Sequence, residues 1–486
     1  MTPESKLAAV ARVQTFLDSR LEQRQVNRIL HGFPSPRFWQ PETISIADVM
    51  RQRDRWNHGS QAPFSLYVGL PFCIRTDPDR CGYCLFPVEV FQGSNQIDTY
   101  LEYLEREGNL FREFFHDVSP ETVYVGGGTP NLMRPQQYLR MMEIVRDVFP
   151  GLSSETSITL EGIPQLFTLE KLASMKAGGI NRVSMGVQQL NTELNQLSGR
   201  KQTAQHVFDA IRWCRQLGLQ CNADLIFGWP RQTLETMVTD LEQLVATGVD
   251  HIAHYELNIG GPTDFSLNRR SELPSPGLTR DMYRVARDFL TSHGYSQRTV
   301  YDFQKTVDVS EFVYEECQRG AERQELWGWG FAGVSDFGGT LEHPGWSYVN
   351  HRRVADYYDA LDRRAFPIER GFAREIGDLR LNTLFKNLQG MQVDRLSYLR
   401  RFEVDVYEEY APIWQALIER NWCTVTAESI KLQGDGAYYV PLIQSLLSEE
   451  RLEQLRASTV RASFAQNALI QLSNSERLTS NLPSTG

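Results

Sequence analysis

The stretch LYVGLPFC, residues Leu66–Cys73, is an apolar run that ends in a cysteine, and seven residues later comes CGYC, residues Cys81–Cys84. Three of the seven cysteines of the chain therefore lie between positions 73 and 84. The apolar run predicts a strand, and the sequence after the cysteines predicts a helix. Thiolates this close together on a loop suit a metal or iron–sulfur centre, because such ions bind soft sulfur ligands.

The pair Cys81 and Cys84 also fits a redox or zinc motif in which Cys73 plays no part. A structural zinc ion normally takes four protein ligands in two close pairs, and the sequence offers no second close pair, since even Cys214 and Cys221 stand seven positions apart. Three thiolates on a [4Fe–4S] cluster would leave one iron open for a small molecule. We therefore expect an iron–sulfur cluster on Cys73, Cys81 and Cys84.

The composition excludes several classes of protein. The chain has 486 residues, more than one ordinary domain, and its 41% hydrophobic and 23% charged residues are typical of a globular protein. A net charge of −10 without a basic run argues against a nucleic-acid partner. No run approaches the roughly 18 apolar residues of a membrane span, and the N-terminus lacks the apolar core of a secretory signal. We expect a cytoplasmic protein that binds no membrane, and cysteines without a disulfide framework agree with this expectation.

The chain divides into five predicted parts. Residues 1–63 form a helical extension and a Pro-rich wrap, whose rings Phe33, Phe38 and Trp39 would anchor it on the catalytic domain. Residues 64–300 form the catalytic domain, and residues 301–370 connect onward and close it. Residues 371–460 form a C-terminal domain with a helix around Leu379–Leu384 and a β-ribbon at Ile430–Leu432 that turns at Gly434–Gly436. Residues 461–486, with little apolar content, form a mobile tail.

The catalytic part alternates strand and helix patterns. Predicted strands begin near Leu66, Thr122, Ser157, Arg182, Asn222 and His251, and predicted helices cover 96–116, 136–149, 168–177, 203–217, 233–246 and 278–294. This alternation predicts βαβ units and an α/β fold, a partial (β/α)6 barrel. The loops at the carboxyl ends of the strands would face the ligand.

Polar residues and glycines stand at these predicted strand ends. The run Val123–Val125 leads into Gly126–Pro130, whose glycines let a ligand approach the backbone. Other strands end in Glu161, Gln188 and Asp224. One such residue alone would be a helix cap or a solvated side chain, but several at corresponding positions are expected to converge on one ligand.

These motifs resemble those of the radical S-adenosylmethionine (SAM) enzymes. The resemblance rests on Pro71–Cys73 with Cys81–Cys84, and on Gly126–Pro130, Ala177–Gln188 and Asp224–Pro230. Within this superfamily the chain is similar to the branch of oxygen-independent coproporphyrinogen III oxidase, which includes heme chaperones, anaerobic heme-degrading enzymes and two-SAM (class C) methylases. The resemblance is strong over 64–300, weaker over 326–350, and returns over 371–450, the C-terminal helical and winged domain of this branch.

The resemblance implies a [4Fe–4S] cluster on the three cysteines, SAM on its open iron and a second SAM nearby. It implies a small-molecule substrate and an electron donor such as flavodoxin or ferredoxin, but it assigns no catalytic residue. The implied contacts with SAM are Tyr67 and Glu161 for the first molecule, Gly127, Gly128 and Thr129 for both, and Gln188, Arg200, Asp224 and Val334 for the second.

The chain departs from the family pattern at four places. Seven residues separate Cys73 from Cys81 where the family usually has three, and Leu85–Phe86 stands where the oxidase has a further cysteine. Gly69 replaces a frequent histidine, and Tyr301–Phe303 lacks the chaperone pattern. We favour a two-SAM enzyme that transfers a methyl or methylene group to an unsaturated carbon. The alternatives are oxidative decarboxylation of a porphyrinogen and a heme chaperone without turnover.

Overall fold

The computed structural model describes residues 3–25, 31–41, 45–57, 63–307 and 325–458. Its main feature is a 12-stranded sheet in the order β14-β13-β12-β11-β1-β4-β5-β6-β7-β8-β10-β9. Six consecutive strands of this sheet run parallel: β1 (Phe64–Leu70), β4 (Thr122–Gly127), β5 (Ser157–Gly162), β6 (Arg182–Gln188), β7 (Gln220–Phe227) and β8 (His251–Glu256). These are the six predicted strands, and the predicted α/β fold is confirmed.

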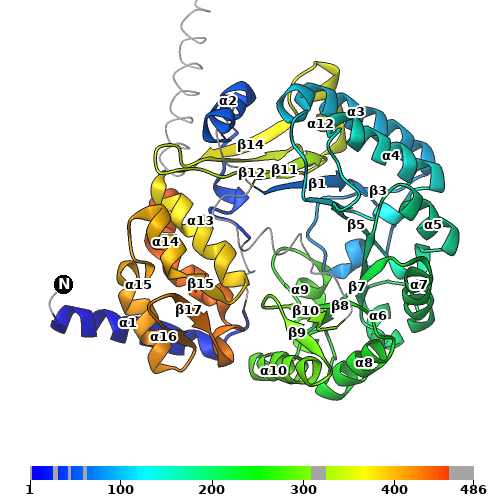
Figure 1. Ribbon diagram of the computed structural model, residues 1–486. Helices are drawn as coiled ribbons and strands as arrows, with labels where there is room; N and C mark the ends of the chain where they lie inside the picture. The colour runs from blue at the N-terminus through cyan, green and yellow to red at the C-terminus, as the bar shows by residue number, and fades with distance from the viewer. Residues whose placement is uncertain (1–2, 26–30, 42–44, 58–62, 308–324, 459–486) are drawn as a thin grey trace, which may run out of the picture.

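Helices cover the outer side of the parallel strands (Figure 1). They are α3 (Ser94–Phe115), α4 (Pro135–Val148), α5 (Leu169–Ala177), α6 (Thr192–Gln196), α7 (Ala204–Leu217), α8 (Leu234–Ala246) and α10 (Pro276–Ser292). Their starts follow from the sequence, because the side chains of Thr168, Thr203 and Thr233 each accept a hydrogen bond from a backbone N–H of the first turn. Gly218 ends α7 in the left-handed conformation that glycine adopts without strain.

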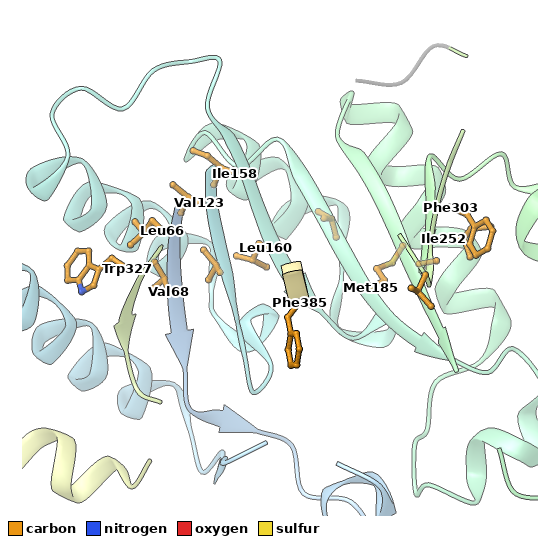
Figure 2. Packing of buried hydrophobic residues seen from close by; sticks show 14 of the residues in the cluster. Leu66, Val68, Val123, Ile158, Leu160, Met185, Ile252, Phe303, Trp327 and Phe385 are labelled. Carbon is orange, nitrogen blue, oxygen red and sulfur yellow. The ribbon is translucent and has the colours of Figure 1, made fainter. Parts of the chain in front are cut away.

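The two faces of the parallel strands differ in polarity. Leu66, Val123 and Ile158 are paired across β1, β4 and β5, so they share one face, and all three are buried in the core (Figure 2). The alternate positions point to the opposite face, the interior of the barrel. There the paired residues are Tyr67, Tyr124, Thr159 and Arg182. The barrel interior is therefore lined with polar groups.

The sheet continues beyond the six predicted strands on both sides. Next to β8 lie the antiparallel strands β10 (Asp302–Lys305) and β9 (Tyr295–Gln297). On the other side β11 (Glu325–Gly330) pairs in parallel with β1, and β12 (Val334–Phe337), β13 (Trp346–Asn350) and β14 (Ile368–Ala373) follow in antiparallel order. The segment predicted as a connection thus contributes strands that periodicity alone did not reveal.

The N-terminal segment joins the barrel side to the C-terminal part. Helix α1 (Pro3–Leu21) packs on α16 (Ala411–Glu419), and α2 (Ile46–Asn57) follows the 3-10 helix η1 (Pro36–Phe38). The predicted anchors Phe33, Phe38 and Trp39 are buried. The Phe33 ring meets Phe385 edge-on at 5.3 Å, so this anchor rests on the C-terminal part rather than on the barrel.

The C-terminal part is mainly helical. It contains α13 (Ile376–Gln389), α14 (Arg395–Phe402), α15 (Val406–Glu409), α16 and a helix over 440–458, whereas α12 (Val354–Asp362) packs on α3 of the barrel. A small antiparallel sheet has the order β15 (Gln392–Asp394), β17 (Ser429–Leu432), β16 (Cys423–Val425). The predicted ribbon strand is therefore present, but Gly434–Gly436 forms the 3-10 helix η6 rather than its turn. The predicted tail 461–486 lies outside the described residues, and none of the described helices is both long and apolar enough to cross a membrane.

Candidate functional site

The three predicted cluster ligands lie on the loop that leaves β1. Cys73 ends the short strand β2 (Phe72–Cys73), which pairs with β3 (Glu89–Val90), and Cys81 lies in the 3-10 helix η2 (Asp79–Gly82). All three thiols are half-buried. The Cys73 sulfur lies 3.1 Å from the hydroxyl oxygen of Thr129, so a predicted SAM contact touches a predicted ligand.

The cysteines are close enough to influence one another electrostatically. Burial raises the pKa of Cys73 and of Cys84, and the neighbouring Cys81 raises both further. Among the described residues, however, no three Cys, His, Asp or Glu side chains converge tightly enough for a single metal ion. A [4Fe–4S] cluster differs from such an ion, because each thiolate binds a different iron. The donor set therefore fits a multi-iron cluster better than zinc.

The glycine run after β4 packs against the cysteine loop. A Cβ at Gly128 would overlap the backbone of Phe72, and a Cβ at Gly127, which has φ +109°, would overlap the backbone of Leu70. The N–H groups of Gly128 and Thr129 donate to the carbonyl oxygens of Leu70 and Phe72, across 2.8 and 2.7 Å. At least one role of Gly127 and Gly128 is thus to let two backbones approach closely.

Gly126, the first of the three glycines expected to let a ligand approach, faces the polar site. A Cβ at Gly126 would lie 2.8 Å from a carboxylate oxygen of Glu161 and 3.0 Å from the Tyr67 hydroxyl. The absence of a side chain at Gly126 therefore keeps the space between Tyr67 and Glu161 open. Val334, another predicted SAM contact, is the first residue of β12. Its backbone packs on Gly328, which is paired with Tyr67 in the register of β1 and β11.

Glu161 is held by two donors. The Tyr124 hydroxyl donates to one carboxylate oxygen across 2.8 Å, and the Gly127 N–H donates to the other across 3.2 Å. Burial raises the pKa of Glu161, while both hydrogen bonds oppose that rise. The Tyr124 ring is also stacked with the ring of Tyr67, with centroids 6.2 Å apart. Tyr124 is a site residue that was missed, although its pairing opposite Tyr67 follows once the strand register is known.

Asp224 lies in a polar cluster formed by β6 and β7. It accepts hydrogen bonds from the Asn222 amide, across 2.6 Å, and from the Ser184 hydroxyl, across 3.2 Å. Burial raises the pKa of Asp224 to about 7, and the nearby Glu161 carboxylate adds to this effect. Arg182 opposes the rise, and its guanidinium lies 2.6 Å from His251 Nδ1 deeper in the barrel.

Gln188, Arg200 and Asp224 come together around one glycine. A Cβ at Gly186 would lie 3.0 Å from the Gln188 amide nitrogen and 3.5 Å from a guanidinium nitrogen of Arg200. Asp224 is the partner of Gly186 in the β6–β7 register, which shifts at Gln188 (φ +65°). Arg200 also donates to the Gly186 carbonyl and, across 3.0 Å, to Gln202.

Arg200 links this group to the cysteine loop. Burial alone would lower the pKa of Arg200, but the adjacent Tyr83 hydroxyl and Cys81 thiol outweigh this effect and raise the pKa. Tyr83 in turn packs edge-on against Trp229, with ring centroids 5.0 Å apart. The structure therefore brings Gln188, Arg200 and Asp224 together near the cysteine loop, whereas Val334 lies apart from them at the start of β12.

Comparisons with known proteins identify a family match and several relatives. Residues 71–244 match the family described as the Radical SAM superfamily. The chain is 28% identical to the oxygen-independent coproporphyrinogen III oxidase of Escherichia coli strain K12 over 388 residues, which cover 76% of this chain and 78% of the relative. It is 27% identical to the heme chaperone HemW of Bacillus subtilis strain 168 over 309 residues, which cover 62% and 77% of the two chains.

A solved structure has the same fold. The coproporphyrinogen III oxidase HemN from Escherichia coli superposes with a TM-score of 0.75 and 24% identity, covering 86% of this chain and 96% of the other. The predicted cofactors, a [4Fe–4S] cluster and SAM, are those of the superfamily matched by residues 71–244. The chain is thus an enzyme with a radical SAM domain over residues 71–244, and its relatives include coproporphyrinogen III oxidases and HemW heme chaperones.

Proposed function

We propose that this enzyme binds two SAM molecules and moves a methyl or methylene carbon from the second one to an unsaturated carbon of a small molecule. The convergence of Gln188, Arg200 and Asp224 around Gly186 carries this proposal. This group lies beside the Tyr67–Glu161 pair and includes neither member of it. Two adjacent polar groups at one barrel mouth suit two ligands better than one.

The charges of the second site match the amino-acid end of SAM. That end has one ammonium and one carboxylate group, so its site needs an acceptor and a cation. Asp224 supplies the acceptor, and Arg200 supplies a planar guanidinium suited to a carboxylate. The Nε atom of Arg200 is buried and has no hydrogen-bond partner among the described residues, so a donor is left over for a ligand.

The first site would combine the three cysteines with the Tyr67–Glu161 pair. Cys73, Cys81 and Cys84 would hold the cluster, while Glu161 would accept hydrogen bonds from the first SAM within the space left open by Gly126. When bound, the cluster and this SAM supply a one-electron cleavage that generates a carbon radical. The reducing electron would come from a flavodoxin or a ferredoxin.

Apolar packing beside the cysteines would keep water away from this chemistry. Tyr83 lies against a small buried cluster that contains Trp229 and Phe265, with ring centroids 5.0 and 5.9 Å from the Tyr83 ring. A reactive radical needs such exclusion, because side reactions with solvent compete with transfer to the substrate.

Oxidative decarboxylation of a porphyrinogen is the second candidate. The similarity to coproporphyrinogen III oxidase over 76% of the chain favours it, since this similarity extends beyond the barrel. The same two groups of residues would serve that reaction. A heme chaperone without turnover is the third candidate, supported by the similarity to HemW.

The products distinguish the three candidates. The reconstituted protein would be incubated without oxygen with SAM, dithionite and a candidate substrate, here coproporphyrinogen III or a small molecule with an unsaturated acceptor carbon. We expect 5′-deoxyadenosine together with S-adenosylhomocysteine. Deoxyadenosine with carbon dioxide would instead establish decarboxylation, and tight heme binding with neither product would establish the chaperone.

A further inference from the structure

The seven residues between Cys73 and Cys81 form a loop that is closed on itself. The Thr76 hydroxyl accepts a hydrogen bond from the Cys81 N–H across 2.8 Å and donates to the Pro78 carbonyl oxygen across 2.9 Å. The Arg80 carbonyl accepts the Cys84 N–H across 3.1 Å. This segment, residues 74–80, therefore holds the backbone of two of the proposed cluster ligands.

The conformation of Cys81 needs this support. Arg80 and Cys81 have φ values of 52° and 57°, in the left-handed region that residues other than glycine seldom occupy. Such a conformation persists only where surrounding contacts hold it. The Thr76 hydroxyl supplies one such contact directly to the Cys81 backbone.

The loop is packed onto the turn that carries Arg200. Gly199 has φ +72°, and a Cβ there would overlap the carbonyl group and the nitrogen of Asp77. The backbone of residues 74–80 thus occupies the space that a side chain at position 199 would need. The neighbouring Arg200 places its guanidinium beside the Cys81 thiol, so loop and turn meet at two points.

A second glycine, Gly82, lets residues 74–80 pack closely on their other side. Gly82 has φ +71°, and a Cβ there would lie 2.9 Å from Pro78 and 3.0 Å from the Phe265 ring. The loop is therefore held between the Gly199 turn and the short helix α9 (Asp264–Asn268).

We propose that residues 74–80 act as a clasp that fixes Cys81 against the Gly199–Arg200 turn, so that retention of the cluster and the position of Arg200 depend on each other. Thr76 and Gly199 are then positioning residues. The inference rests on the proposed function for the cluster ligands and for Arg200. It assigns a role to the longer spacing that the family resemblance left unexplained.

The test compares Gly199→Ala with a matched control, Gly218→Ala. Both glycines have left-handed φ values, +72° and +66°, but a Cβ at Gly218 would meet only the Lys176 side chain, at 3.7 Å. Both variants carry similar backbone strain, but only Gly199→Ala also overlaps a neighbouring backbone, so its melting temperature is expected to fall further. Only Gly199→Ala would disturb the clasp.

The readout is the release of iron from the reconstituted protein to excess EDTA without oxygen. The overlap in Gly199→Ala should displace the loop and break the Thr76–Cys81 hydrogen bond, so we expect iron release about ten-fold faster than in wild type. Gly218→Ala should match wild type. Equilibrium dialysis with radiolabelled SAM should show the second site weakened in Gly199→Ala. Equal iron release and equal SAM binding in the two variants would overturn the inference.

A second pair of variants tests the hydroxyl itself and does not depend on the fit at Gly199. Thr76→Val keeps the shape of the side chain but removes the hydroxyl that accepts the Cys81 N–H, whereas Thr76→Ser retains this hydroxyl. Faster iron release in Thr76→Val with recovery in Thr76→Ser supports the clasp, and wild-type release in Thr76→Val rejects it. If the wild-type chain took up no cluster at all, the proposed function would fail instead.

Discussion

The hydroxyl of Tyr124, on β4, donates a 2.8 Å hydrogen bond to the carboxylate of Glu161, near the carboxyl end of the adjacent strand β5. This bond fixes one carboxylate oxygen, and the Gly127 N–H fixes the other. Glu161 is therefore oriented before any ligand arrives, which lowers the entropic cost of binding.

Replacing Tyr124 with Phe should weaken the first SAM site. One hydrogen bond to a charged group would be lost, so we expect roughly ten-fold weaker binding, equivalent to ~1.4 kcal/mol. Equilibrium dialysis with SAM measures this effect. Tyr138→Phe is a matched control, because the Tyr138 hydroxyl is buried without a partner among the described residues. That variant should bind SAM as wild type does, and equal loss in both variants would contradict the role of Tyr124.

The ligand set is tested by cysteine replacement. Anaerobic reconstitution of wild type should give about four irons and four sulfides per chain, and Cys73→Ala, Cys81→Ala or Cys84→Ala should abolish the cluster. Cys214→Ala removes a buried thiol outside this loop and should leave the iron content unchanged. If Cys73→Ala kept a full cluster that still cleaves SAM, Cys73 would not be a cluster ligand.

The ionisation of Asp336 is expected to make the free energy of unfolding depend on pH. This buried carboxylate accepts from Lys386 across 2.8 Å and pairs with Arg374. Burial would raise the pKa of Asp336, but the two cations outweigh this effect and hold it well below its usual range. The folded state therefore binds fewer protons than the unfolded state, whose Asp has a pKa of about 3.9. The stabilisation is complete at neutral pH and is lost as the pH falls below about 4.

Asp336→Asn leaves two buried cations without their anion, so we expect it to lower the free energy of unfolding by about 3–5 kcal/mol at pH 7. Urea unfolding at pH 7 and near pH 3.5 would measure the change, and the difference from wild type should shrink at the lower pH. Asp359→Asn is the control, since its pair with Arg363 is exposed and should change stability by less than about 0.5 kcal/mol. A constant difference at both pH values would contradict the titration of Asp336.

The elements of the barrel were predictable because helix and strand periods are local properties of the sequence. Glu161 and Gln188 could be singled out, since each is a polar residue at a strand end. Asp224 was singled out for the same reason, but β7 continues to Phe227, so Asp224 lies within the strand. Tyr124, Arg182 and His251 were missed, because their roles depend on which face of a strand points inward and on the register between strands. Strand β11 was missed for a related reason, because its partner β1 lies far away in sequence.

Asp224→Asn separates the two proposed SAM sites. The amide keeps the size of the side chain but removes its charge, so a ligand ammonium would lose a charge-assisted contact worth about 1.5–3 kcal/mol. Because the pKa of Asp224 is raised to about 7, the wild-type contact should also strengthen as the pH rises through 7, whereas the variant should show no such change. Cluster content and deoxyadenosine formation should remain, and S-adenosylhomocysteine formation should fall.

Glu161→Gln is the matched comparison, since this neighbouring carboxylate is assigned to the first SAM and its loss should suppress deoxyadenosine formation itself. If dialysis found one SAM per wild-type chain, with the cluster intact and substrate bound, the two-SAM proposal would be wrong, and Asp224 would serve the substrate or the polar cluster with Ser184 instead.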